Sequence, residues 1–468
     1  MKATFVVAAA AAALLSACGG DGGSVTTAPP AQASNAMVQV NLGDGPADNL
    51  VAVQTIVNAV TLTTPDGGSV TVMATPRPME MMQLMGTVAP LALANVPQGT
   101  YSGATMTFGP ATVTYVDAAT GQIMQKTTPG PISATVTFSP ALTIGTAPTV
   151  INFDMNMAAS VAIDSGGNVA MTPMLTARMN PMVTASRDPE DGGMHGLMAM
   201  VGAIDGSRFT LSTMQGLTGM SLMANAATQF GGVTGMGMMS GSMLVSVDAM
   251  PQPDGTWVAS HVQSRMDAGG AMAGGIVTGI TGNPPTQLTL VMRNGLGGGM
   301  MPSDLAGPST VTLDDHTQFS IDADGVDLGG LPFTPMFDRA HLARGQGIDT
   351  WSGGQMTHHG GMGGMFGPMM TSGTALAAAS VQLEPQGLRG TVSGYTSNGA
   401  RSSFTLTMPA DSAFAKLTGA SVVTVYQQGG TTLRGLTAIT DGSNVQVRGL
   451  LFLDGGVYRL VAGRIVAG

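Results

Sequence analysis

The side chains with the clearest capacity for chemistry lie together in one glycine-rich segment, residues 353–373. Thioether sulfur and imidazole nitrogen are ligands that suit Cu(I). The glycines offer methionine no strand or helix face to fill, so the usual packing role of methionine explains this segment poorly. The segment raises the hypothesis of a Cu(I) site, while a low-complexity insertion without function stays the favoured alternative. The candidate ligands are Met356, His358, His359, Met362, Met365, Met369 and Met370.

Aspartates between residues 314 and 327 form a second candidate, a site for a hard cation such as Ca²⁺, which takes about six to eight oxygen ligands. Asp322, Asp324 and Asp327 are close together, but their spacing departs from that of a calcium-binding loop and no glutamate closes the group. The Asp-Gly pair at 324–325 is instead typical of a tight turn between strands. We therefore predict a solvated hairpin turn here.

Catalytic motifs are absent from the sequence. It contains no G-x-S-x-G, H-E-x-x-H or G-x-x-x-x-G-K-[ST], and the six histidines include one adjacent pair and no helical ligand pair. A Ser-His-Asp site assembles in space and cannot be read from spacing alone, but nothing here favours one. Trp257 and Trp351 are the only tryptophans and stand far apart, so the sequence gives weak support for a sugar-binding aromatic platform. We predict no enzyme.

The N-terminus has the features of an export signal that ends at the single cysteine. Lys2 precedes an apolar run from residue 3 to residue 15, and Leu15-Ser16-Ala17-Cys18 follows. This arrangement is typical of a secretory signal peptide, and the run is shorter than the roughly 20 residues of a membrane-spanning helix. Leu-Ser-Ala-Cys resembles the lipobox of bacterial lipoproteins. The resemblance implies that residues 1–17 are cleaved and that Cys18 is acylated; the alternative is an ordinary signal with an incidental cysteine. Gly19, rather than an aspartate, implies the outer membrane.

The composition limits the possible partners. Charged residues are 9% of the chain, against about 25% in typical globular domains, and the formal net charge is −10. Only three lysines occur and no basic cluster forms, which excludes nucleic-acid binding through phosphate neutralisation. The expected partners are a membrane, contacted through the lipid anchor, and an unknown envelope or extracellular ligand.

Alternating patterns beyond a flexible tether at residues 18–35 predict an all-β protein. In residues 37–42, Val38, Val40 and Leu42 alternate with Gln39 and Asn41, the pattern of a strand buried on one face. Asp-Gly pairs favour the backbone angles of hairpin turns, and we predict such turns at all of them. These pairs begin at Asp21, Asp44, Asp66, Asp191, Asp205, Asp254, Asp324, Asp441 and Asp454.

The first folded block, residues 36–186, resembles a family of bacterial lipoproteins, the domain of unknown function 4382. The resemblance implies an antiparallel β-sandwich and carries no activity. It rests on four segments, residues 42–48, 96–101, 113–117 and 151–154.

Beyond a charged, glycine-rich segment at 187–196, which we predict to be an exposed linker, three stretches repeat the same motifs. Val-Gly-Ala-Ile at 201–204 returns as Val-Thr-Gly-Ile at 277–280 and as Val-Ser-Gly-Tyr at 392–395. The repeats resemble the domain of unknown function 5666, which implies small barrel-like β modules. Their unequal lengths favour separate beads. The predicted ranges are 197–266, 270–384 with the insert 353–373, and 387–468.

These features together predict a lipid-anchored envelope protein, with a β-sandwich followed by three small barrel-like modules. A binding or structural role in the periplasm or at the cell surface is the favoured function. Soft-metal binding by the methionine-rich insert is the alternative.

Overall fold

The computed structural model describes residues 34–45, 47–117, 119–241, 243–266, 272–296, 308–323, 325–352, 375–399 and 401–468. These residues are nearly all in strands and turns, and the α-helices among them, α1 (Met157–Ser160) and α3 (Ala413–Thr418), are one to two turns long. The predicted all-β fold class is confirmed. No helix within the described ranges has the length and apolar character needed to cross a membrane.

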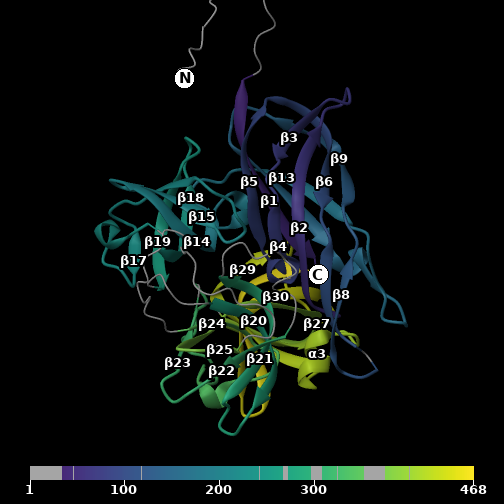
Figure 1. The fold of residues 1–468 in the computed structure, drawn as a ribbon, viewed down its shortest axis with the longest axis vertical. Helices are drawn as coiled ribbons and strands as arrows, with labels where there is room; N and C mark the ends of the chain where they lie inside the picture. The colour runs from purple at the N-terminus through teal and green to yellow at the C-terminus, as the bar shows by residue number, and fades with distance from the viewer. Residues whose placement is uncertain are drawn as a thin grey trace, which may run out of the picture. The chain divides into compact units, whose positions relative to one another are not determined.

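Two facing sheets form the N-terminal β-sandwich (Figure 1). One sheet has the order β13-β10-β1-β5; the other has the order β8-β7-β2-β6-β9, with β3 and β4 paired to β2. The pair β1 and β10 is parallel, while the other pairs of these two sheets are antiparallel. The strands are β1 (Asn35–Gly45), β2 (Leu50–Thr63), β3 (Ser69–Met73), β4 (Arg77–Glu80), β5 (Val88–Pro97), β6 (Gly99–Phe108), β7 (Ala111–Val116), β8 (Ile123–Thr128), β9 (Ile132–Ile144), β10 (Thr149–Asn156), β11 (Val161–Ile163), β12 (Val169–Met171) and β13 (Leu175–Pro181), and the 3-10 helix η1 is Met81–Leu84.

Strand β1 is buried on both faces, which its alternation does not predict. Val38, Val40 and Leu42 enter the sandwich core as expected. The polar side chains of Gln39 and Asn41 are equally inaccessible to solvent. Asn41 donates a hydrogen bond to the carbonyl oxygen of Pro189 at 2.8 Å, so the segment around residue 189 covers the polar face of the strand.

The segment that we predicted to be an exposed linker is a packed one, and this expectation is wrong. It contains the 3-10 helix η2 (Pro189–Asp191), whose Pro189 is buried. Asp188 accepts hydrogen bonds from Arg434 Nε at 2.9 Å and from Arg464 Nη1 at 3.0 Å. Charged residues in a glycine-rich stretch indicated exposure, but here the charges meet arginines from the far end of the chain.

We expect Asp188→Asn to lower the free energy of unfolding by about 2–3 kcal/mol, because charge-assisted hydrogen bonds to two arginines are weakened. Burial acts to raise the pKa of Asp188, but Arg464, the Glu190 amide and Arg434 outweigh it and hold that pKa below its usual value. The ionised form is therefore favoured by folding. Its contribution is present above about pH 4, the unfolded-state pKa, and is lost as the pH falls through the lower folded-state pKa.

Urea titrations of wild type and variant between pH 3 and pH 7 measure this difference. Asp315→Asn is the matched control, because Asp315 is 95% exposed in its ion pair with Arg339 and exposed pairs contribute little. A loss of stability at Asp188 that does not change with pH would contradict the electrostatic explanation.

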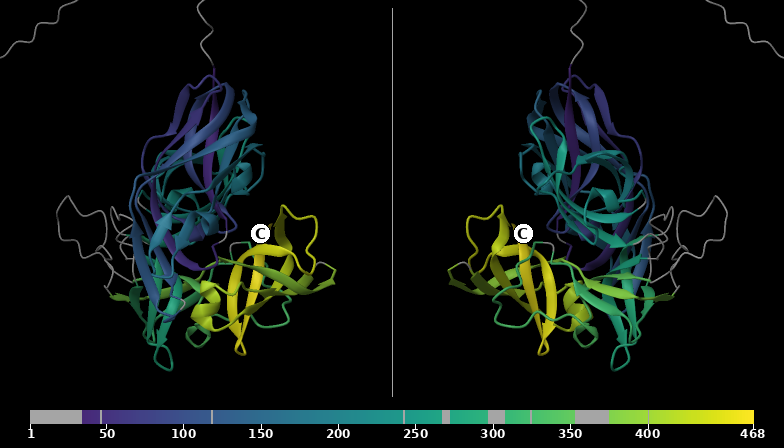
Figure 2. Two further views of the ribbon diagram at one scale, coloured as in Figure 1. Left: turned by 90° about the vertical axis from the view of Figure 1, so that its right-hand side faces the viewer. Right: turned by 90° about the vertical axis from the view of Figure 1, so that its left-hand side faces the viewer.

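The three repeats share one pattern of strand pairing. Where a strand is split into two segments, the segments count as one strand here. In each repeat the first strand pairs antiparallel with the second, and the third strand runs parallel to the last. The fourth strand pairs antiparallel with both the first and the last. The third repeat is a closed barrel, β27-β28-β29-β31-β30 (yellow in Figure 2). In the first repeat, an additional pairing of β16 with β19 joins the two sides of the sheet.

The strands of the first repeat are β14 (Met194–Asp205), β15 (Arg208–Thr213), β16 (Met220–Met223), β17 (Gln229–Gly231), β18 (Leu244–Pro251) and β19 (Trp257–Met266), with the 3-10 helix η3 (Met236–Met238). Those of the second are β20 (Met272–Thr281), β21 (Gln287–Leu296), β22 (Pro308–Thr312), β23 (Gln318–Ile321), β24 (Gly347–Trp351), β25 (Ala375–Ala377) and β26 (Ser380–Leu383), with η4 (Arg339–His341). Those of the third are β27 (Gln386–Asn398), β28 (Arg401–Thr407), β29 (Val422–Arg434), β30 (Asn444–Asp454) and β31 (Val457–Ala467).

The repeats are not separate beads, because residues 35–468 form one compact unit. One apolar cluster joins Val51 of the sandwich to Ile276 of the second repeat and Leu417 of the third. The core of the second repeat also includes Leu450 and Phe452 from the third repeat. Each module therefore buries apolar surface against its neighbours as well as within itself. This burial stabilises the folded chain, whose single cysteine cannot form a disulfide within it.

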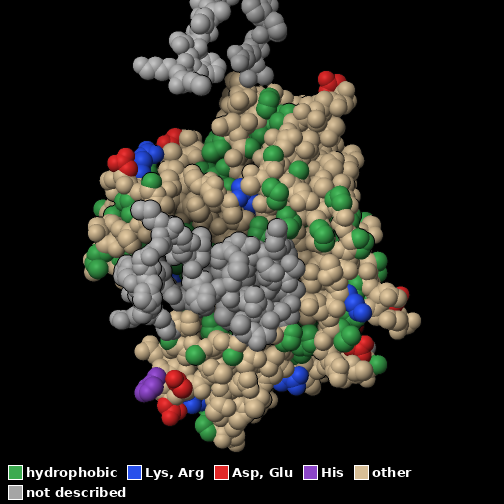
Figure 3. Space-filling view, in the orientation of Figure 1, with side chains coloured by type: hydrophobic (Ala, Val, Ile, Leu, Met, Phe, Trp, Pro, Cys, Tyr) green, Lys and Arg blue, Asp and Glu red, His purple; other side chains and the backbone are tan. Residues whose placement is uncertain are grey.

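Charged side chains are scattered over the face shown in Figure 3, in keeping with their 9% share of the sequence. Two partly buried arginines instead connect one module to another. Arg389 of β27 pairs with Asp48 at 3.0 Å, and Arg448 of β30 donates to the carbonyl oxygen of Gln83 at 3.1 Å. The few charges of this chain thus contribute to the arrangement of its modules.

Candidate functional site

The residues that the sequence singled out for acylation and for Cu(I) binding, and Asp324 of the acidic run, fall outside the described part of the chain. This holds for the lipidation candidate Cys18 and for every ligand candidate of the insert, Met356, His358, His359, Met362, Met365, Met369 and Met370. The Cu(I) hypothesis therefore stays a prediction. Within the described ranges, no group of three or more His, Cys, Asp or Glu side chains is placed to hold a metal ion.

The acidic run at 314–327 divides into separate roles. Asp314 accepts a hydrogen bond from the amide of His316 at 2.9 Å, and Asp327 accepts one from the amide of Gly329 at 2.8 Å, so both stabilise turns as predicted. Asp322 is different. It is paired with Arg265, which comes from the last strand of the first repeat.

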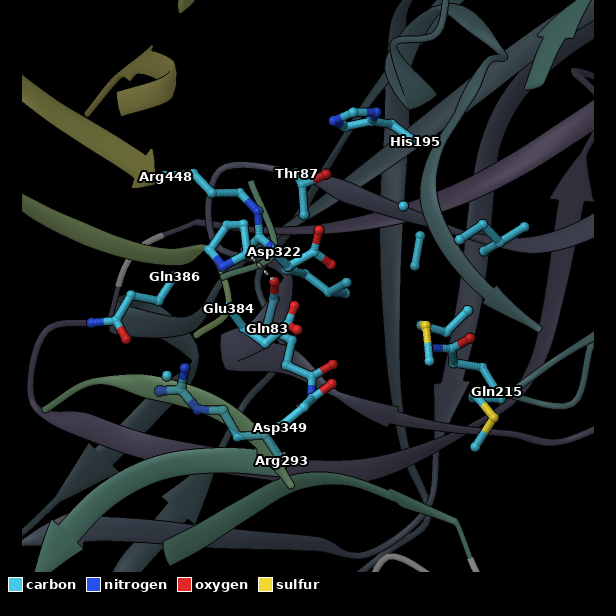
Figure 4. A pocket seen from close by; sticks show the side chains of 18 of the residues that line it. Gln83, Thr87, His195, Gln215, Arg293, Asp322, Asp349, Glu384, Gln386 and Arg448 are labelled. Atoms are coloured by element: carbon cyan, nitrogen blue, oxygen red, sulfur yellow. Dashed lines mark hydrogen bonds between the residues drawn. The ribbon is translucent and has the colours of Figure 1, made fainter. Parts of the chain in front are cut away.

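The Arg265–Asp322 pair lies in the wall of a cavity of 240 Å³ that all four modules line (Figure 4). The sandwich contributes Gln83 and Thr87 from η1 and the turn that follows it, and the third repeat contributes Arg448 from β30. Cavities between modules are common places for ligands, because several elements can direct polar groups to one point. The remaining labelled side chains in Figure 4 are His195, Gln215, Arg293, Asp322, Asp349, Glu384 and Gln386.

Three buried polar atoms of cavity-lining residues have no hydrogen-bond partner in the described part of the chain. They are the indole nitrogen Nε1 of Trp351, the guanidinium nitrogen Nε of Arg265 and the amide oxygen Oε1 of Gln386. Buried polar groups are nearly always paired in folded proteins, so each exception calls for an explanation. All three atoms are inaccessible to solvent, so they lie behind the surface of the cavity rather than at it.

Secondary structure holds these three side chains in place. Trp351 ends β24, whose five residues are all buried, and its ring packs with Leu244 and Met272. Arg265 is near the end of β19 and is anchored by Asp322 and by Gln382 Oε1 at 3.1 Å. Gln386 begins β27 and donates its own amide hydrogen to the carbonyl oxygen of Gly345 at 2.8 Å. The unpartnered atoms are therefore fixed rather than free to rotate toward solvent.

Carboxylates surround Arg265. Burial acts to lower the pKa of this guanidinium, but Asp322, Glu384 and Asp349 outweigh it and raise the pKa above its usual value. Arg265 consequently stays charged at any physiological pH. The cavity thus carries a fixed cation beside three carboxylates, together with the arginines Arg293 and Arg448 elsewhere in its lining.

A second cavity, of 340 Å³, shares the Arg265–Asp322 pair and lies between the first and second repeats. Its lining includes Asp248 and His261, which face each other across β18 and β19. Asp248 also accepts a hydrogen bond from the amide of Gly196 at 2.8 Å and lies 3.2 Å from His195 Nδ1. Burial opposes the ionisation of Asp248, but His195, Gly196 and Arg187 together hold its pKa below the usual range.

Sequence reasoning missed this site because its residues are distant in the chain and belong to different modules. Two signals were present. Trp351 is one of only two tryptophans, and Asp349 is a charged residue within a strand that is otherwise suited to a core. Neither signal gives the position of Arg265 or Gln386, which depends on how the repeats pack.

Comparison with known proteins gives one family match, to the model described as Domain of unknown function (DUF5666), over residues 200–263. No curated protein matches the chain. The matched range begins in β14 and ends in β19. Arg265 also belongs to β19 and lies two residues after the end of the matched range. Over its first repeat the chain is therefore similar to a domain of that family, as the sequence motifs led us to expect.

Proposed function

We propose that this protein is a lipid-anchored binding protein of a bacterial envelope, which takes a small polar ligand in the cavity between its four modules. The observation that supports the binding role is the cavity of 240 Å³ that all four modules line. Its wall holds Arg265 in charged form beside the carboxylates of Asp322, Asp349 and Glu384, so a polar ligand finds charged groups of both signs there.

The lipid anchor in this proposal is supported by the sequence around Cys18. Acylation would hold the protein at the membrane, because each buried methylene adds about 0.8 kcal/mol and two or more chains anchor firmly. Residues 19–35 would act as the tether. We also propose that the sandwich belongs with the domain of unknown function 4382, which the four sequence segments support.

We expect Cys18→Ala to abolish lipid modification and to move the protein from the detergent phase to the aqueous phase in a detergent partition experiment. Mass spectrometry of the wild-type mature N-terminus should find an acylated Cys18, while Ser16→Ala should keep the modification. An unmodified N-terminus at another residue would contradict the anchor without affecting the cavity.

The binding role is tested by native mass spectrometry of the protein purified from its own envelope. Wild type should carry a small molecule, and Met198→Trp should lose it, because Met198 lines the cavity and the larger side chain fills part of it. Met238→Trp is the matched control, because Met238 is exposed and lies outside the cavity. That variant should keep the ligand. A wild-type protein that carries no ligand and binds none would overturn the binding role.

A further inference from the structure

We propose that methionines on one side of the cavity bind a soft monovalent metal ion, Cu(I). The ligands are the thioether sulfurs of Met198, Met214 and Met272, which all line the cavity. The sequence raised this chemistry for the insert 353–373, whereas the residues proposed here belong to the described part of the first and second repeats. The site goes beyond the polar ligand proposed above and does not depend on it.

Strand pairing brings Met198 and Met214 together. Met198 belongs to β14, and Met214 directly follows β15. The amide of Met214 donates to the carbonyl oxygen of Met198 at 3.3 Å, one step beyond the pairing of Ala199 with Thr213. Residues directly opposite each other on antiparallel strands hold their Cβ atoms about 4.5–5.5 Å apart on one face of the sheet. The two flexible thioether side chains can therefore reach a common point.

Packing between the repeats adds Met272. It is opposite Trp351 in the pairing of β20 with β24, and the two residues belong to one apolar cluster. Met198 and Met214 pack against this cluster. Sulfur atoms are visible beside the labelled Gln215 in Figure 4. Three thioether groups from two modules thus lie in one cluster at the wall of the cavity.

The fold of the repeats does not require methionine at these three positions. The repeats can be aligned by the valine of the first strand that pairs with a leucine of the second, which are Val201 and Leu211 in the first repeat. In this alignment the counterparts of Met198 are Gly274 and Arg389, those of Met214 are Arg293 and Pro409, and those of Met272 are Gly196 and Gly387. Packing within a single module therefore does not explain the methionines. Met198 and Met214 are also only partly buried, which leaves part of each side chain accessible.

The chemistry of the ligands selects the metal. Thioether sulfur is a soft ligand that suits Cu(I), whereas carboxylate and carbonyl oxygens suit Mg²⁺ and Ca²⁺. The charged groups of the lining are balanced, with three carboxylates against three arginines, so they do not oppose a cation. A monovalent ion held by neutral sulfurs adds only a single charge to this balance.

The test is an anaerobic competition titration of the full chain with Cu(I) against bicinchoninate, a chelator of Cu(I). The triple variant Met198→Leu, Met214→Leu, Met272→Leu keeps the apolar volume and removes the three sulfurs. We expect its affinity for Cu(I) to be at least about tenfold below that of wild type, since the loss of a residue that merely supports a metal ligand already costs about 10–100-fold.

The matched control replaces three exposed methionines outside the cavity with leucine, Met174, Met238 and Met336. This control should keep the wild-type affinity. A further variant, with every methionine of residues 353–373 changed to leucine, separates the insert from the cavity. It should still bind Cu(I) with the affinity of the site proposed here.

Tryptophan fluorescence locates the ion without changing any methionine. Trp351 belongs to the cluster, and Trp257 lies outside the cavity. Cu(I) should quench the emission of wild type and of Trp257→Phe, while Trp351→Phe should lose most of that quenching.

Three results would overturn the proposal. They are a wild-type chain that binds no Cu(I), a triple variant that binds it as tightly as wild type, and equal quenching in Trp351→Phe and Trp257→Phe. The last result would place the ion away from the cluster. None of them bears on the polar ligand of the cavity, which native mass spectrometry tests separately.

Discussion

Replacing Arg293 with methionine is expected to lower the free energy of unfolding by about 3–5 kcal/mol, the usual cost of removing one partner from a buried ion pair. Arg293 belongs to β21 of the second repeat and extends into the sandwich. Its Nε donates to the carbonyl oxygen of Val51 at 2.9 Å and lies 4.0 Å from Glu80 Oε2. Methionine fills similar space but leaves the Glu80 carboxylate without its cation.

Glu80 makes the loss larger, because its position is fixed by the backbone. Its Oε1 accepts from the amide of Val53 at 2.8 Å, and its Oε2 accepts from the amide of Gln83 at 2.8 Å, where it caps η1. Burial raises the pKa of Glu80, with Arg293 acting against that increase. Without Arg293 the carboxylate has no counter-charge and must either take up a proton or remain buried as an anion.

Urea or thermal unfolding of the variants measures the effect. Arg401→Met is the matched control, since Arg401 is exposed and donates to the carbonyl oxygen of Gly330 at 2.7 Å; its loss should change stability little. In a double-mutant cycle, Arg293→Met with Glu80→Gln should cost less than the sum of the single changes. Additive losses, or a loss below about 1 kcal/mol for Arg293→Met alone, would show that the pair does not stabilise the contact between the modules.

The strands and their repetition were predictable, because each depends on local pattern. The motif Val-Gly-Ala-Ile and its counterparts lie in β14, β20 and β27, the first strand of each repeat. Alternation identified the core side of β1 correctly. It failed on the other side, where Asn41 is covered by residues about 150 positions later. A single strand carries no information about which distant segment will cover it.

The same limit applies to the candidate site. Arg265, Trp351 and Gln386 stand in three separate strands, and their meeting depends on strand register and on how the repeats pack. The sequence directed attention to a methionine-rich insert because its composition is unusual locally. Arg265 and Gln386, in contrast, are ordinary residues in their own segments, and only the packing of the repeats brings them to the same cavity as Trp351.

The Asp-Gly pairs show where a local rule holds and where burial overrides it. Asp205 and Asp454 are the last residues of strands and stand just before tight turns, as predicted. Asp254 lies within a turn. Asp44 does not mark a turn. It lies inside β1, is almost fully buried, and neither of its carboxylate oxygens has a hydrogen-bond partner among the described residues. Arg293 forms its ion pair with Glu80, so the Asp44 carboxylate is left without an ion pair of its own.

We therefore expect Asp44→Asn to stabilise the protein at pH 7, by about 1–3 kcal/mol, the cost of an unsatisfied buried group. Burial, with the negative charges of Asp154 and Glu80, raises the pKa of Asp44 well above its usual value, against the weaker opposing effects of the Met157 amide and Arg293. Folding thus favours the protonated form. The contribution of Asp44 to stability is complete below the unfolded-state pKa, about 3.9, and declines as the pH rises toward the folded-state pKa. The asparagine variant lacks this decline.

The advantage of Asp44→Asn over wild type should accordingly be small near pH 3 and should grow as the pH increases toward neutrality. Asp117→Asn is a control of opposite sign, because hydrogen bonds from Thr120 hold the pKa of that exposed carboxyl below its usual value. Asp44→Asn should also partly restore the stability lost in Arg293→Met. The double variant retains only the Glu80 carboxylate without a counter-charge, whereas Arg293→Met alone retains both Glu80 and Asp44. If Asp44→Asn is instead less stable than wild type at pH 7, the carboxylate has a partner that it needs, and Asp44 belongs to a binding site rather than to a strained core.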